Sequence, residues 1–367
     1  MKINPVQLAV SCLIISFHLL AAASPEEDHR GKLLAPALYI LGDSLVDSGN
    51  NNLLPTLAKA NFKPYGVTFC RGPTGRFTNG RTVADFIAEF LGLPYPPPYM
   101  DLRGLLPATG MNYASGSCGI LYETGKVIGK CLALGDQINL FEQTVTTGLP
   151  ILYQHNQKQL SEYLAKSLFV VAIGSNDYIN NYLQPHLYAS STLYSPQAFA
   201  QHLIDSLSQK LQRLHELGAR KVLVFGIGPV GCIPSIAKAQ EHNGKCVEEV
   251  NRMVTLYNDK LGPMLKNLTA SLPGSNFILG NIYMFSYSSI QIPTTIGLTD
   301  SRNPCCITWA NGTSACVPRL EPCTNMDKRF FWDGFHLTEA VYKIVASDCI
   351  NNSSVCWPTS LKDLVKI

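Results

Sequence analysis

The feature that most constrains this fold is a pattern that occurs twice: a short apolar run, then a glycine, then small polar residues. Residues 37–41 (ALYIL) lead into Gly-Asp-Ser at 42–44, and residues 167–173 (SLFVVAI) lead into Gly-Ser-Asn-Asp at 174–177. Each run is too short and too uniformly apolar for an amphipathic helix, so each indicates a buried strand. The sequence therefore predicts two strands that end in the same kind of polar loop.

A long amphipathic helix separates the second run from a third. Ser195 and Pro196 are typical of an N-cap and first helical position, an apolar stripe follows over 199–217, and Gly218 is typical of a C-cap. Another apolar run begins at Lys221. Because the order is strand, helix, strand, we expect a parallel sheet with crossover helices. Further helices are expected over 83–92 and 246–272 and after Thr338, with further strands over 221–225 and 276–279.

Ser44 is a candidate nucleophile because ligands bind at the carboxyl ends of parallel strands, where a rigid strand can deliver a serine. Most Gly-Asp-Ser tripeptides are ordinary turns or helix caps, so Ser44 needs partners elsewhere in the chain. Among the histidines, only His336 has an aspartate three positions earlier, Asp333. A short bend there lets the carboxylate hold one imidazole nitrogen while the other faces a serine. The alternative is a capping aspartate beside a surface histidine.

A glycine-rich segment at 226–231 (GIGPVG) fits the nucleotide-binding pattern G-x-G-x-x-G after a strand. A dinucleotide turn needs free backbone N–H groups and an immediate helix, and Pro229 and Pro234 disfavour both. We therefore reject a nucleotide site.

The N-terminus predicts export. Lys2 precedes an apolar stretch over 8–20, which small residues follow at 21–24, the layout of a signal peptide. The stretch is short and interrupted by polar residues, which argues against a membrane anchor. We expect a signal peptide over 1–23, a single domain over 35–357 and a secreted product with no stable membrane span. The formal charge of +3, with no stripe of Lys and Arg, argues against nucleic acid as a partner.

Cysteine usage agrees with an oxidising compartment. Removal of Cys12 with the signal peptide leaves 11 of the 12 cysteines, and disulfides are favoured over zinc because no C-x-x-C or suitably spaced histidine is present. The odd number predicts at least one free thiol, most simply a buried one. Glycosylation acceptors are Asn267, Asn311, Asn351 and Asn352.

Six segments in order resemble the conserved blocks of plant-type GDSL esterases/lipases, in the SGNH hydrolase superfamily. The segments are 42–50 (GDSLVDSGN), 73–81 (PTGRFTNGR), 112–116 (NYASG), 173–178 (IGSNDY), 228–234 (GPVGCIP) and 331–336 (FWDGFH). The resemblance covers nearly the whole mature chain. It implies a flavodoxin-like three-layer α/β/α sandwich with a five-stranded parallel sheet, and serine-dependent hydrolysis of carboxylic esters.

The resemblance also implies roles for single residues. Ser44 corresponds to the nucleophile, His336 to the general base and Asp333 to the residue that orients it. The oxyanion hole would consist of the Ser44 N–H, the Gly116 N–H and the side-chain amide of Asn176. No metal or organic cofactor is implied.

Three departures from the family pattern bear on specificity: Leu337 stands where proline is usual, Ile307 stands where glycine is usual, and the segment before Cys305 is unlike the family. The expected substrate is a small-molecule, lipid or cell-wall ester. Two other readings stay open: an acyltransferase that passes the acyl group to an alcohol, and a non-catalytic cell-wall or defence binding protein. Neither the natural ester nor the oligomeric state follows from the sequence.

Overall fold

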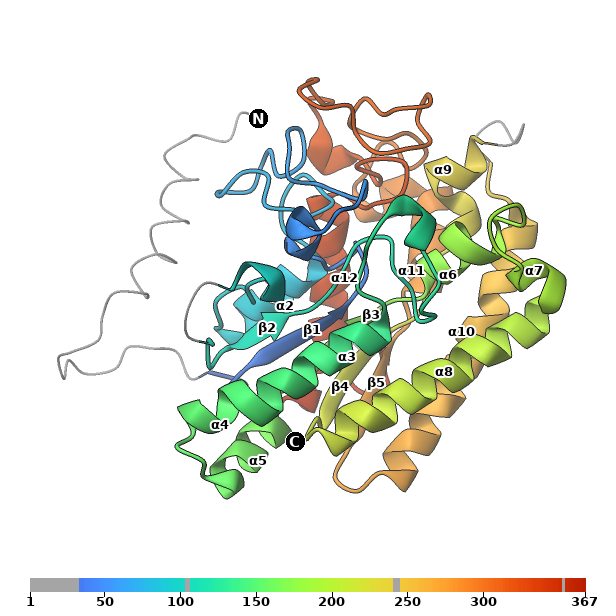
Figure 1. Cartoon of the computed structure of the whole chain (residues 1–367). Coiled ribbons are helices and arrows are strands. Elements are labelled where there is room, and N and C mark those ends of the chain that lie inside the picture. Colours follow the sequence, from blue (N-terminus) through green and yellow to red (C-terminus); the bar gives the residue numbers. More distant parts are fainter. Residues whose placement is uncertain (1–32, 103–105, 240–244, 352–353) are drawn as a thin grey trace.

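The computed structural model describes residues 33–102, 106–239, 245–351 and 354–367 (Figure 1). The expected signal peptide, 1–23, lies outside the described residues. The described part contains a six-stranded sheet in the order β2-β1-β3-β4-β5-β6. The strands are β1 (Leu38–Gly42), β2 (Gly110–Asn112), β3 (Leu168–Ala172), β4 (Lys221–Phe225), β5 (Asn276–Gly280) and β6 (Cys356–Trp357).

Five of these strands run parallel, and only β6 pairs antiparallel, with β5. The register aligns Gly42 with Ala172, Ala172 with Phe225, and Phe225 with Gly280, so the last residues of four strands lie side by side. The loops that follow β1, β3 and β4 therefore all leave the sheet at the carboxyl ends of the strands. The predicted strands at 37–41, 167–173, 221–225 and 276–279 are confirmed, whereas β2 and β6 are too short to give a sequence signal.

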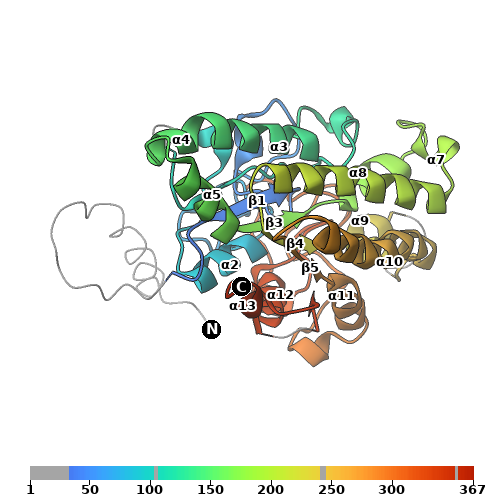
Figure 2. The same cartoon turned by 90° about the horizontal axis from the view of Figure 1, so that it is seen from below.

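Helices cover both faces of the sheet, as Figure 2 shows. One face packs on α3 (Leu134–Gln143), α5 (Gln157–Lys166), α8 (Pro196–Glu216) and α10 (Glu248–Ser271), and the other on α2 (Val83–Leu91), α11 (Ile282–Gln291), α12 (Glu339–Asn351) and α13 (Leu361–Leu364). Strand side chains alternate between two cores: Tyr39 and Phe169 enter the first, while Leu38 and Val170 enter the second. This confirms the three-layer α/β/α sandwich, to which β6 adds a sixth strand.

The predicted helix starts and stops are largely confirmed. The Ser195 hydroxyl accepts the Ala198 N–H at 3.3 Å in front of α8, and Gly92 ends α2 in the left-handed conformation. Helices α3, α5 and α11 have no counterpart in the sequence prediction. Shorter helices are α4 (Leu149–Leu152), α6 (Ser175–Asp177), α7 (Ser190–Leu193) and α9 (Pro234–Ala237). None of the helices in the described part of the chain is long and apolar enough to cross a membrane.

Five disulfides join cysteines that are near each other in sequence: Cys118–Cys131, Cys232–Cys246, Cys305–Cys323, Cys306–Cys316 and Cys349–Cys356. Two of them lie within the loop 305–323, which we call the cysteine loop. Cys70 is exposed and disulfide-bonded as well. The prediction of a buried free thiol is therefore wrong for the described residues, among which no cysteine is free.

Candidate active site

Ser44 leaves the sheet from a strand end that is tightly fixed. The Gly42 N–H donates to Gln137 Oε1 and the Gln137 amide donates back to the Gly42 carbonyl, both at 2.8 Å. A Cβ at Gly42 would lie 2.4 Å from the carbonyl oxygen of Ala172, so only glycine fits where β1 passes β3. Ser44, two residues after Gly42, is partly exposed and lines a cavity.

A continuous hydrogen-bonded chain joins Ser44 to His336 and Asp333. The Ser44 Oγ lies 2.8 Å from His336 Nε2, and His336 Nδ1 lies 2.8 Å from each carboxylate oxygen of Asp333. The N–H groups of Phe335 and His336 both donate to Asp333 Oδ1 at 2.8 Å, so the bend from 333 to 336 closes on its own carboxylate. The structure thus brings together three residues that span 44–336 in the sequence.

Asp333 is fully buried, and its environment favours the carboxylate. Burial alone raises the pKa of Asp333, but the charge of His336 and hydrogen bonds from His336, the Tyr65 hydroxyl and the Phe335 N–H outweigh burial and lower the pKa below its usual value. A carboxylate kept ionised in this way fixes the imidazole tautomer with its proton on Nδ1.

Two aromatic residues that sequence reasoning did not select support this arrangement. The Phe77 ring packs against the His336 ring with centroids 5.0 Å apart. The Tyr65 hydroxyl donates to Asp333 Oδ2 at 2.6 Å. Neither contact has a sequence signal, because the partners lie more than 250 positions apart.

Polar residues that follow Ser44 hold the loop 112–117 beside it. Asp47 accepts the N–H groups of Gly49 and Asn50 through Oδ1, and accepts the Gly116 N–H through Oδ2 at 3.1 Å. Asn51 donates to the Gly116 carbonyl at 2.9 Å and accepts the Ser115 hydroxyl. The segment 47–51, which follows Ser44, therefore anchors the loop 112–117.

Gly116 is held in place by sterics as well as by these bonds. A Cβ at this position would lie 2.8 Å from Phe77 Cζ and 3.0 Å from Asn51 Nδ2. Its N–H is already bonded to Asp47. The role of Gly116 as an oxyanion donor stays a prediction, and the N–H would have to leave Asp47 in order to bind the oxyanion. The next residue, Ser117, lines the cavity and has a positive φ of 69°. Within the described residues, neither the N–H of Ser117 nor that of Ser44 has a hydrogen-bond acceptor.

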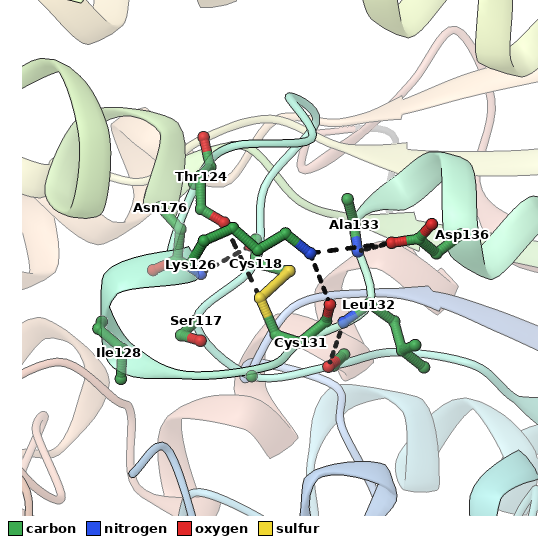
Figure 3. Close-up of a disulfide and its surroundings, with 12 residues drawn as sticks. Ser117, Cys118, Thr124, Lys126, Ile128, Cys131, Leu132, Ala133, Asp136 and Asn176 are labelled. Atoms are coloured by element: carbon green, nitrogen blue, oxygen red, sulfur yellow. Dashed lines mark hydrogen bonds and ion pairs between the residues drawn. A yellow bond between two sulfur atoms is a disulfide. The ribbon is translucent and has the colours of Figure 1, made fainter. Parts of the chain in front are cut away.

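Asn176 lies in α6, directly after β3, and its side chain reaches the same loop. Its amide nitrogen donates to the Cys118 carbonyl at 3.0 Å, and its amide oxygen accepts from Asn180 at 2.9 Å. Figure 3 shows Asn176 beside Ser117 and Cys118, where the Cys118–Cys131 disulfide closes the loop. These two bonds fix the orientation of the Asn176 amide, and Asn176 lines the cavity.

Three further buried carboxylates support the sheet side of the site. Burial raises the pKa of Asp43 to about 7 and outweighs the hydrogen bond from the Leu45 N–H. Burial also raises the pKa of Asp47 to about 6, against several backbone N–H donors, and that of Asp177 to about 6, against two backbone N–H groups and the Thr124 hydroxyl. Asp177 receives the N–H groups of Ile120 and Leu121 and so fixes the loop beyond Ser117.

The cavity in front of Ser44 has a volume of about 300 Å³ and mostly apolar walls. Its wall includes Leu57, Phe77, Ile179, Ile233, Ile282 and Phe335. The glycine-rich segment that we rejected as a nucleotide site contributes Gly228 and Pro229. Of the departures from the family pattern, Leu337 lines the cavity, whereas Ile307 is exposed and does not.

The remaining predicted site residues lie apart from the cavity. Asn267, Asn311 and Asn351 are exposed, and Asn352 lies outside the described residues. Across the described ranges, no group of three or more His, Cys, Asp or Glu side chains is arranged to hold a metal ion.

Comparison with known proteins shows the family to which this chain belongs. The family model of GDSL-like lipases and acylhydrolases matches residues 38–349. GDSL esterase/lipase 7 of Arabidopsis thaliana is 42% identical over 362 residues, which cover 97% of this chain and 98% of the relative. A second GDSL esterase/lipase of Arabidopsis thaliana is 40% identical over 354 residues, which cover 94% of this chain and 91% of the relative.

Proposed function

Because the chain belongs to the GDSL-like lipase and acylhydrolase family, it is a carboxylic ester hydrolase, and we propose that it is a secreted one that works through Ser44, His336 and Asp333. The observation that carries the proposal is the unbroken chain of 2.8 Å contacts from the Ser44 hydroxyl through the imidazole to a buried carboxylate. This is the arrangement in which a serine hydroxyl becomes a nucleophile at neutral pH.

Acylation begins when the Ser44 oxygen attacks the ester carbonyl carbon. His336 Nε2 takes the hydroxyl proton while Asp333 holds Nδ1–H and stabilises the imidazolium that forms. The tetrahedral intermediate then collapses, the bond to the leaving alcohol breaks, and His336 returns the proton to that alcohol. The acyl group stays on Ser44 as an ester.

Deacylation repeats these steps with water. His336 removes a proton from the water as its oxygen attacks the acyl carbon, and then gives the proton back to Ser44 as the acid leaves. The enzyme returns to its starting state, so one ester and one water yield one acid and one alcohol.

The negative charge on the tetrahedral oxygen needs donors that are already oriented. We assign the Ser44 N–H and the Asn176 amide to this role, in line with the resemblance. For the third donor we favour the Ser117 N–H over the predicted Gly116 N–H. Support for this comes from the position of Ser117 in the cavity wall, and from the bond that engages the Gly116 N–H with Asp47.

The apolar wall of the cavity favours an uncharged aliphatic or aromatic acyl group. A volume of about 300 Å³ is at the lower end for small-molecule sites, so short acyl chains are expected to fit inside and longer ones to extend beyond the mouth. We therefore propose a lipid-like or small aromatic ester as the substrate class.

Secretion is supported by two independent features. The sequence over 1–24 has the layout of a signal peptide, and five disulfides form among the described cysteines, as is typical of oxidising compartments.

Hydrolysis of p-nitrophenyl esters from acetate to palmitate tests the function. The purified protein is expected to release p-nitrophenol, with Ser44→Ala and His336→Ala losing this activity at an unchanged unfolding midpoint. Ser167→Ala and His215→Ala are the matched controls, because Ser167 is buried outside the cavity and His215 lies on the surface. Release by the wild type that persists in Ser44→Ala would contradict the proposal.

The same assay distinguishes an acyltransferase. Added alcohol acceptors compete with water for the acyl-enzyme. For the same amount of p-nitrophenol released, the ratio of new ester to free acid gives the fraction of acyl groups transferred to the alcohol. A protein that cleaves none of the esters while binding cell-wall material would instead be the non-catalytic binding protein.

A further inference from the structure

Tyr65 is a buried phenol whose hydroxyl makes two directed hydrogen bonds. It donates to Asp333 Oδ2 at 2.6 Å and accepts the Cys316 N–H at 3.2 Å. The side chain is 0% exposed, so neither bond can be replaced by bulk water. The hydroxyl thus lies between the carboxylate proposed to orient His336 and the backbone of the cysteine loop.

The bonds around Asp333 show what Tyr65 adds. Oδ1 is satisfied from within the bend 333–336, by two backbone N–H groups and His336 Nδ1. Oδ2 receives His336 Nδ1 and, from outside the bend, the Tyr65 hydroxyl. Without Tyr65 every donor to the carboxylate belongs to the bend itself, and Oδ2 keeps only His336 Nδ1.

The Tyr65 ring is itself fixed by packing. It lies edge-on to Phe62 with centroids 5.3 Å apart and to Phe77 with centroids 6.1 Å apart, and Phe77 in turn packs on His336. The ring is therefore placed by the same aromatic group that supports the imidazole. A rigid donor of this kind restricts a partner more effectively than a mobile one.

The second bond ties the arrangement to the cysteine loop. Cys316 forms a disulfide with Cys306, whose N–H donates to the Trp332 carbonyl at 2.9 Å. The Gly334 N–H donates to the Ser314 carbonyl at 2.9 Å. The segment that carries Asp333 thus meets the cysteine loop on both sides of the carboxylate, and Tyr65 bridges the two.

We propose that Tyr65 is a positioning residue of the hydrolase, which holds the Asp333 carboxylate in the orientation that His336 requires and couples it to the cysteine loop. The inference rests on the proposed triad, since Tyr65 acts only through Asp333. The Tyr65 hydroxyl is bonded to Asp333 and Cys316 and not to Ser44 or His336. A purely structural role, in which the phenol only fills the core, is the alternative that the experiment has to separate.

Tyr65→Phe removes the hydroxyl and keeps the ring. We expect kcat for p-nitrophenyl butyrate to fall about 10- to 100-fold, the range for loss of a hydrogen bond to a charged group, while KM stays unchanged. Tyr113→Phe is the matched control. Tyr113 is also 0% exposed and its hydroxyl lies 2.7 Å from the Thr144 hydroxyl, but it does not line the cavity, so its kcat should match the wild type.

A double-mutant cycle with Asp333→Asn separates positioning from packing. If Tyr65 acts through the carboxylate, Tyr65→Phe lowers kcat in the wild-type background but adds no further loss to Asp333→Asn. A core-filling role predicts the same fold loss in both backgrounds. An equal loss in both, or a wild-type kcat in Tyr65→Phe, would overturn the inference.

Two unnatural side chains keep the test valid if Tyr65→Phe does not fold. At position 65, para-chlorophenylalanine fills the same volume with no donor, and para-aminophenylalanine offers an N–H donor in its place. We expect low kcat with the chloro group and recovery with the amino group; equal kcat values would overturn the inference. Ser44-dependent activity of the wild type is measured first, so its absence would count against the proposed function and not against Tyr65.

Discussion

The two halves of this site are held by different kinds of structure. Ser44 and Asn176 follow the ends of β1 and β3, neighbouring strands of the sheet whose last residues are in register. The bend 333–336 does not directly follow a strand of the sheet, and the backbone of Trp332 and Gly334 is bonded to the cysteine loop. In Figure 1 the loop after β1 (blue) and the cysteine loop 305–323 (dark orange) both lie on the side of the sheet where the strands end.

The sheet therefore positions the proposed nucleophile, whereas disulfides and aromatic contacts surround the proposed base. The difference extends to the carboxylates. Asp43, Asp47 and Asp177 on the sheet side have pKa values raised by burial, while Asp333 has a lowered pKa because charge and hydrogen bonds outweigh burial. The sheet side uses its carboxylates to receive backbone N–H groups, and the loop side uses one to hold the His336 imidazole.

Asn176→Ala tests whether a residue on the sheet side acts locally. Loss of one oxyanion donor is expected to lower kcat by about 10²–10³-fold with little change in KM. Asn258→Ala is the matched control, because Asn258 makes two bonds to Ile227 after β4 but does not line the cavity. A kcat of Asn176→Ala no lower than that of the control would remove Asn176 from the oxyanion hole.

Replacing both Cys306 and Cys316 by serine tests whether the loop side depends on its disulfide. The bond closes a separation of 10 residues, so we expect a loss of about 2–4 kcal/mol in the free energy of unfolding. Because the Asp333 segment is bonded to this loop, kcat should also fall, roughly 10- to 100-fold.

Serine replacement of Cys349 and Cys356 is the control for that prediction. This disulfide connects α12 to β6, away from the cavity, and its removal should cost stability without lowering kcat in the folded protein. Equal kcat in the two double variants would break the contrast between the halves.

Asp43→Asn tests the raised pKa on the sheet side. With a folded pKa of about 7 against an ordinary value of 3.8, the folded protein binds more protons than the unfolded chain between about pH 4 and pH 7. The free energy of unfolding should therefore fall as pH rises through this window. The expected decrease is up to a few kcal/mol, the order of magnitude that corresponds to this pKa shift.

The asparagine variant cannot titrate and should lose this part of the pH dependence, as thermal unfolding from pH 4 to pH 8 would measure. Asp205→Asn, on the exposed face of α8, should keep the wild-type profile. If Asp43→Asn kept it too, the pKa of Asp43 would not be raised.

The sequence predicted the sheet side better than the loop side, for a physical reason. A buried strand leaves an uninterrupted apolar run, and the residue that follows it is placed by the strand, so Ser44 and Asn176 could be selected from local pattern. His336 and Asp333 could be selected because three positions separate them. The contacts that hold this pair could not, since Tyr65 lies 268 positions from Asp333 and cysteine spacing does not determine pairing.

Gly116 illustrates a subtler limit. Its place in the small-residue loop was predicted, but its N–H is bonded to Asp47 and its lack of a side chain makes room for Phe77. The steric need for glycine and the bond to Asp47 both depend on residues from other blocks, which a single sequence does not bring together.

The most direct test of the account is the reaction of the protein with a fluorophosphonate, followed by intact-mass measurement and peptide mapping. The account predicts one adduct per chain, located on Ser44, formed far more slowly in His336→Ala and absent in Ser44→Ala. An adduct on another serine, or labelling of Ser44 at the same rate without His336, would contradict the claim that the two halves form one catalytic unit.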